Sequence, residues 1–127
     1  MEQTRVVLLG YERDRIDLYG SILKDEGYDV YLLYPNEANI QIMNTLMPHI
    51  VLVDVTKVHC QIGPALFQWL QEHTEIAVLF CMDRYLEAPQ VIAYAGNNNE
   101  TIYADPFSID GFVEKIRHIQ LKKTVLH

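Results

Sequence analysis

The sequence has no long hydrophobic run and little positive charge. No apolar stretch approaches the roughly 20 residues that a membrane-spanning helix needs, so we expect no membrane insertion. Lys and Arg number 10 against 17 Asp and Glu, and the net charge is −7. Nucleic acids and anionic membranes select clustered Lys and Arg, so neither is expected as a partner. The first residues, "MEQTR", contain no basic stretch leading into an apolar segment, and we expect a cytoplasmic protein.

Several chemical motifs are also missing. Cys60 and Cys81 show neither CxxC nor metal-ligand spacing, so we expect no disulfide and no zinc site. The chain contains no GxGxxG, no GxxxxGK[ST] and no GxSxG, the signatures of dinucleotide binding, nucleotide phosphate binding and a hydrolase nucleophile. We therefore expect a protein that is not an enzyme and that needs no cofactor.

What the chain does contain is a regular alternation of apolar runs and helical patterns. Half of its 127 residues are hydrophobic, enough to bury a core, and we expect a single domain over residues 1–127. The stretch "HIVLVD" is apolar on successive residues, as in a strand that is buried on both faces. Ser108 is expected to cap a closing helix over residues 108–121. Strands are predicted near residues 5–9, 28–33, 49–54, 76–82 and 101–104.

The order βαβαβαβαβα predicts a parallel sheet with helices on both faces. Right-handed crossovers and five strands favour a flavodoxin-like, doubly wound α/β fold with strand order 2-1-3-4-5. In such folds the working site lies outside the carboxyl ends of the strands. The residues that follow the strands there are Gly10, Tyr11, Glu12, Asp54, Met82, Asp83 and Asp105.

Three stretches make the chain resemble a response-regulator receiver domain of the CheY-like kind, over nearly its whole length. They are "HIVLVD" ending in Asp54, "AYAG" before the fifth strand, and "DPF" after it. The resemblance implies that Asp54 is the candidate phosphoacceptor. It further implies an acidic pair after the first strand that holds Mg²⁺, a Thr or Ser after the fourth strand, and a lysine after the fifth.

This sequence departs from the family pattern at those partner positions. The acidic pair falls on Gly10 and Tyr11, and the lysine position holds Asp105. The hydroxyl position falls on Met82, or on Cys81 if the register shifts by one. Each unit charge pair at about 4 Å is worth about 4 kcal/mol at an effective dielectric of 20, so replacing a lysine by an aspartate strongly disfavours a dianionic group.

Three interpretations of Asp54 remain open at this stage: an inefficient phosphoacceptor, a relic that hydrogen-bonds a neighbouring loop, or part of a rearranged site. Clustered acids could also bind a divalent cation, with Glu12 and Asp54 as candidates beside Asp83 and Asp105. The alternative for Glu12, Asp83 and Asp105 is exposure to solvent or capping of helix N-termini. No metal is expected, and Mg²⁺ enters only if Asp54 is phosphorylated.

The leading hypothesis is an atypical receiver domain that acts as a phosphorylation-independent interaction module in phosphorelay-type signalling. One alternative is a working receiver phosphorylated on Asp54 by a histidine kinase, and another is a small-ligand or divalent-metal sensor that uses the cleft. The resemblance implies protein partners such as a histidine kinase or an output domain. It also implies self-association through a face formed by the fourth helix, fifth strand and fifth helix. In this sequence we assign Tyr94, Tyr103, Phe112 and Lys115 to that face.

Overall fold

The computed structural model describes residues 3–10, 12–54, 64–81, 101–103 and 109–125. Several features named in the sequence analysis lie outside these ranges. They are loop 55–63, the predicted fourth helix between Pro89 and Gly96, and the residues Tyr11, Met82, Asp83 and Asp105. The elements are β1 (Arg5–Leu9), α1 (Arg13–Asp25), β2 (Asp29–Leu33), α2 (Glu37–Leu46), β3 (Ile50–Asp54), α3 (Pro64–Glu72), β4 (Ala77–Cys81), β5 (Thr101–Tyr103) and α5 (Ile109–Val125).

The five strands form one parallel sheet in the order β2-β1-β3-β4-β5, which confirms the predicted fold class. Every residue of β3 and β4 is buried, as the uninterrupted apolar runs predicted. β2 lies at the edge of the sheet, and its residues are half-buried throughout.

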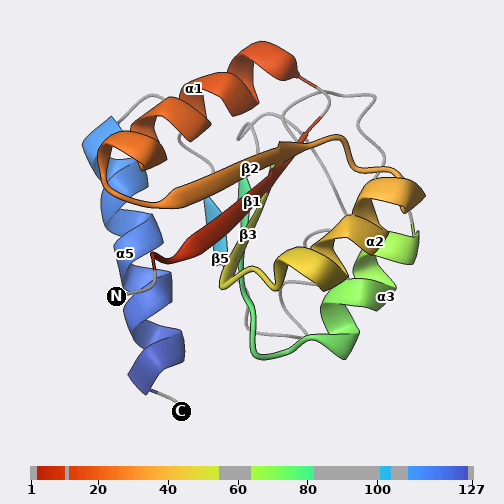
Figure 1. Ribbon diagram of the computed structural model, residues 1–127. Coiled ribbons are helices and arrows are strands. Elements are labelled where there is room, and N and C mark those ends of the chain that lie inside the picture. The colour runs from red at the N-terminus through yellow and green to blue at the C-terminus, as the bar shows by residue number, and fades with distance from the viewer. Residues whose placement is uncertain (1–2, 11, 55–63, 82–100, 104–108, 126–127) are drawn as a thin grey trace.

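Successive residues of each strand pack into two separate hydrophobic cores, one on each face of the sheet. Val7, Leu9, Val51 and Val53 pack with residues of α2 and α3. Val6, Leu8, Leu52 and Leu79 pack on the other face with residues of α1 and α5. Figure 1 shows this division, with α2 and α3 together on one side of the sheet and α1 and α5 on the other. The inner face of α5 consists of Phe112, Val113, Ile116 and Ile119, which are all buried.

Local sequence signals mark where the helices begin and end. Oδ1 of Asn36 accepts a hydrogen bond from the main-chain N–H of Asn39 at 2.9 Å and caps α2. Gly27 has a φ of 95° just past the end of α1, a conformation that glycine adopts without steric cost. α2 ends differently, because Met47 takes the left-handed conformation with a φ of 50°.

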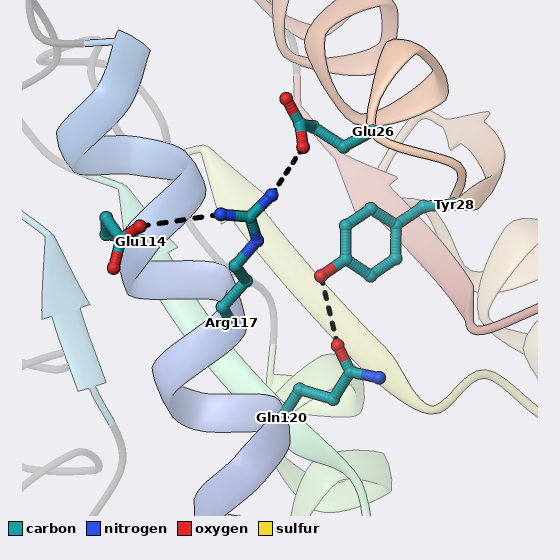
Figure 2. Close-up of polar contacts among 5 residues, drawn as sticks. All are labelled: Glu26, Tyr28, Glu114, Arg117 and Gln120. Atoms are coloured by element: carbon teal, nitrogen blue, oxygen red, sulfur yellow. Dashed lines mark hydrogen bonds and ion pairs between the residues drawn. The ribbon is translucent and has the colours of Figure 1, made fainter.

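Polar contacts tie α5 to the start of the sheet and the end of α1 (Figure 2). Nη2 of Arg117 lies 2.7 Å from Oε2 of Glu26, while Tyr28 donates a hydrogen bond to Oε1 of Gln120 at 3.0 Å. Nε2 of Gln120 in turn donates to Thr4 at 2.9 Å. α5 extends to Val125, beyond the predicted end at residue 121, and among the helices of the described residues none is long and apolar enough to cross a membrane.

Candidate functional site

Asp54 is the last residue of β3 and lies at the carboxyl edge of the sheet, where the sequence placed the site. Its side chain is only 1% exposed. β1 ends next to it at Leu9, and Cys81 of β4 is its partner in the strand register. The central carboxylate therefore sits within the sheet edge, and its surroundings determine what it can do.

Arg15, from the first turn of α1, forms an ion pair with Asp54. Its Nε lies 3.4 Å from Oδ2 of Asp54, and the arginine side chain is 32% exposed. Nη2 of Arg15 also donates a hydrogen bond to the hydroxyl of Tyr19 at 2.8 Å, and the guanidinium carbon lies 5.7 Å from the centre of that ring. The guanidinium is thus held between Asp54 and Tyr19, and Asp54 already has a positive partner within the chain.

A line of contacts connects this ion pair to the last helix. The ring of Tyr19 stacks on Phe112 of α5, with centroids 4.7 Å apart and planes 27° from parallel. Burial is the main cause that raises the pKa of Tyr19 well above its ordinary value of 10.0, so this hydroxyl keeps its proton. Because Phe112 is 2% exposed and packed inside the molecule, it cannot contribute to the interaction face to which the sequence analysis assigned it.

Gly10 lies against Asp54, and no side chain fits there without a rearrangement. A Cβ at this position would lie 2.7 Å from Cγ2 of Ile16 and 3.1 Å from Cβ of Asp54. Real Cβ atoms essentially never come within 3.0 Å of another heavy atom. Packing of Ile16 therefore occupies the room that a metal-binding carboxylate at position 10 would need.

The described residues at this edge supply little of a magnesium site of the receiver type. Gly10 contributes no carboxylate, and Arg15 already balances the charge of Asp54. Glu12, the other candidate ligand, is the N-cap residue of α1, but its side chain makes no capping hydrogen bond. Within the described ranges, no group of three or more His, Cys, Asp or Glu side chains is arranged to hold a metal ion.

Cys81, the alternative hydroxyl position, carries a buried thiol. Burial first, and the neighbouring charge of Asp54 second, raise its pKa well above the ordinary value of 9.0, and Arg15 offsets only part of this. A thiol that stays protonated is a poor nucleophile. We therefore assign Cys81 a packing role beside Asp54.

Arg15 is the residue that the sequence analysis missed. A cation in the first turn of a helix is unfavourable because that end of the helix carries partial positive charge. A nearby anion offsets this cost, and Asp54 supplies one from the end of β3. The signal was therefore present in the sequence, although the pairing depends on how α1 packs on β3.

No protein-family model and no curated protein matches the sequence. The structure, in contrast, is similar to solved receiver domains. It matches the CheY-like receiver domain protein of Methanospirillum hungatei JF-1 with a TM-score of 0.82 and 12% identity, over 99% of this chain and 100% of that one.

The same fold recurs in two further neighbours. The receiver domain of a modulated diguanylate cyclase from Desulfovibrio desulfuricans G20 gives a TM-score of 0.79 and 20% identity, covering 99% of this chain and 100% of that one. A response regulator protein from Burkholderia multivorans gives 0.68 and 16%, covering 93% and 95%. The chain thus has the fold of response-regulator receiver domains.

Proposed function

We propose that this chain is an atypical receiver domain that works in the cytoplasm as a phosphorylation-independent interaction module of two-component-type signalling. The likeness of the whole chain to receiver domains supports the general role. The surroundings of Asp54 support the second part of the proposal, that the module acts without phosphorylation.

The ion pair between Arg15 and Asp54 carries this proposal. Phosphoryl transfer requires a carboxylate oxygen that is free to approach phosphorus in line with the leaving group. Here Oδ2 of Asp54 faces the guanidinium at 3.4 Å, and the carboxylate side chain is 1% exposed. A donor molecule must displace Arg15 before Oδ2 can bond to phosphorus.

The charge balance around Asp54 also disfavours phosphorylation. An aspartyl phosphate is close to dianionic, and a single guanidinium supplies one positive charge to balance it. The sequence places a further acid, Asp105, where receivers carry a lysine. Each uncompensated unit pair at about 4 Å costs about 4 kcal/mol at an effective dielectric of 20. Because Gly10 supplies no carboxylate to hold magnesium, we expect the phosphorylated state to be disfavoured by several kcal/mol.

In this proposal Asp54 has a structural role. It holds Arg15, Arg15 holds Tyr19, and Tyr19 stacks on Phe112 of α5. The helix surfaces that receivers present to protein partners are then fixed without modification. A histidine kinase or an output domain would recognise this constant shape.

Phosphorylation is tested directly with Mg²⁺ and acetyl phosphate, followed by intact-mass measurement, and with a beryllofluoride salt, followed by amide NMR shifts. We expect no covalent adduct and no shift around Asp54, whereas a receiver with the full acid set in the same mixture should react. Asp54→Asn is the matched control for any reaction at another site. An adduct lost in Asp54→Asn would establish the alternative, a working receiver phosphorylated on Asp54.

Two further variants test which difference from the receiver pattern prevents phosphorylation of Asp54. Arg15→Met frees the carboxylate, and Asp105→Lys restores the family's positive charge. We expect neither change alone to permit phosphorylation, because Gly10 still leaves the magnesium site incomplete. Phosphorylation of Arg15→Met alone would identify the ion pair as the sole block and would contradict the metal argument.

Self-association belongs to the same proposal. Receiver-type dimerisation through the face that includes α5 predicts a homodimer, which light scattering after size exclusion measures directly. Lys115 on α5 is half-buried, and its neighbours Glu114 and His118 are exposed. A charge reversal, Glu114→Lys, should weaken a dimer built on this face, and a monomeric wild type would remove self-association from the proposal.

A further inference from the structure

A pocket of about 460 Å³ lies at the amino ends of β1, β3 and β4, at the edge of the sheet opposite to Asp54. Arg5, Ile50 and Ala77, the first residues of these strands, contribute to its lining. The volume falls within the range of about 300–1,000 Å³ that is usual for small-molecule sites. None of the lining residues belongs to the candidate site around Asp54.

One wall of the pocket is aromatic and apolar. The rings of Trp69 and His73 stack with centroids 4.0 Å apart and planes 19° from parallel, and both line the pocket. Nε1 of Trp69 donates a hydrogen bond to Oδ1 of Asn44 at 2.7 Å, which fixes the indole. Met47 and Ile76 add apolar surface. This wall suits the flat, apolar body of a ligand.

Positive and donor groups lie on the strand side. Nδ1 of His49 accepts a hydrogen bond from the main-chain N–H of Arg5 at 2.9 Å, so the ring proton lies on Nε2, which remains a donor. Nε of Arg5 is buried and has no hydrogen-bond partner among the described residues. Arg5 also lines the pocket, and the positive charge of its guanidinium favours an anion there.

The remaining polar groups fix the orientation of a ligand. The Nδ1–H of His73 donates to the carbonyl oxygen of Trp69 at 2.7 Å, which leaves Nε2 as an acceptor. Glu75 is the one acid among the described residues that line the pocket. An anionic group is therefore favoured near Arg5 and His49, and disfavoured near Glu75 and His73.

We propose that this pocket binds a small aromatic carboxylate, with the carboxylate on Arg5 and His49 and the ring against Trp69 and His73. In a chain of net charge −7, the part of the lining formed by Arg5 and the Nε2–H group of His49 is a favourable place for an anion. This proposal is independent of the function assigned to Asp54, and it gives the domain a second site, which binds a ligand.

The test uses benzoate as the probe and amide NMR as the readout. Titration should give saturable shifts of the Arg5, His49 and Ile76 amides and of the indole N–H of Trp69. Because the chain has one tryptophan, its fluorescence reports on the same pocket independently. Benzamide, which has a similar shape but no charge, and acetate, which has no ring, should both bind much more weakly.

Matched variants separate specific binding from a general salt effect. Arg5→Met keeps the apolar stem and loses the charge, and should raise the Kd for benzoate by at least roughly tenfold, the loss expected for one charge-assisted hydrogen bond. Arg13→Met removes a charge from an exposed position on α1, 63% exposed, and should leave the Kd unchanged. His49→Ala, at an exposed position, tests the second donor if Arg5→Met fails to fold.

Three outcomes would overturn the proposal: no saturable shift of the pocket amides at millimolar benzoate, equal affinity for benzamide, or an unchanged Kd in folded Arg5→Met and in His49→Ala. Asp54→Asn should bind benzoate like the wild type. A failure of this pocket to bind therefore says nothing against the function proposed for the opposite edge.

Discussion

Arg15 and Asp54 differ greatly in exposure, with side chains 32% and 1% exposed. Water can reach part of the guanidinium, whereas the carboxylate depends on the protein. Removing Arg15 as Arg15→Met leaves a buried charge without its partner, which costs about 3–5 kcal/mol for a fully buried pair and less when one partner is partly exposed. We expect a loss of about 1–3 kcal/mol in the free energy of unfolding, measured by urea denaturation at neutral pH.

A double-mutant cycle with Asp54→Asn tests whether this loss comes from the pair. When position 54 is already uncharged, Arg15→Met should cost much less. Arg15→Lys should recover only part of the stability, since an ammonium cannot reproduce the fixed fork that reaches both Asp54 and Tyr19. Equal losses in the wild-type and Asp54→Asn backgrounds would show that Arg15 acts through packing alone.

The second prediction concerns the close packing of Gly10 against Ile16. Gly10→Ala should destabilise the protein by about 1–3 kcal/mol, the usual cost of overpacking a core, because the new methyl meets Cγ2 of Ile16 at 2.7 Å. Ile16→Leu removes the branch at Cβ, so the double variant should lose less stability than the two single losses added together. Strict additivity in thermal or urea unfolding would contradict this steric explanation.

The candidate site was predictable from the sequence only in part. Asp54 and Gly10 could be placed because Asp54 ends β3 and Gly10 follows β1, and parallel strands end at one edge of the sheet. Arg15 could not be paired with Asp54, because that contact depends on where α1 crosses the sheet. The buried position of Phe112 in contact with Tyr19 was missed for the same reason, since it depends on the packing of α1 against α5.

A residue with positive φ lies at the end of both α1 and α2, but it is a glycine after α1 and a methionine after α2. Gly27 has a φ of 95°, and a Cβ there would meet nothing within 4 Å, so Gly27→Ala isolates the backbone cost. Met47 takes a φ of 50° and is 56% exposed. A left-handed conformation costs a residue with a side chain roughly 1 kcal/mol relative to glycine.

The two substitutions should therefore act in opposite directions. Gly27→Ala should lower the free energy of unfolding by about 1 kcal/mol, and Met47→Gly should raise it by up to about 1 kcal/mol. Urea denaturation of both variants beside the wild type measures this. Destabilisation by Met47→Gly would mean that the side chain contributes more through contacts than its backbone conformation costs.

Elements buried on both faces were the most predictable. β3 and β4 lie where continuous apolar runs placed them, because a parallel strand between two helical layers must be apolar at every position. The end of the closing helix was less predictable, and α5 continues to Val125. Its last residues are polar and basic, and a helix of this composition carries no stop signal such as Gly or Pro.

The strand order of the sheet followed from the alternation of strands and helices, right-handed crossovers and chain length, none of which requires knowledge of a single contact. The sheet then joins two cores, and the Asp54 end of the sheet holds two groups, Cys81 and Tyr19, that both resist ionisation because they are buried. Their ionisation is therefore linked to unfolding of the domain.

This linkage predicts a loss of stability at alkaline pH. The pKa values of Cys81 and Tyr19 are raised by burial above the ordinary 9.0 and 10.0, so above those values the unfolded chain releases protons that the folded chain retains. The free energy of unfolding should then fall with rising pH, by at most about 1.4 kcal/mol per pH unit for each group. Below the ordinary thiol pKa, neither group should contribute any slope.

Urea denaturation between about pH 8 and about pH 11 measures this slope for the wild type, Cys81→Ala and Tyr19→Phe. Cys81→Ala should flatten the first part of the decline, and Tyr19→Phe the part above the ordinary tyrosine pKa of 10.0. Tyr28, whose pKa is also raised by burial, contributes the same background to all three proteins. Parallel curves for the three proteins would mean that Cys81 and Tyr19 ionise in the folded domain as easily as in the unfolded chain, and that the sheet edge around Asp54 admits water.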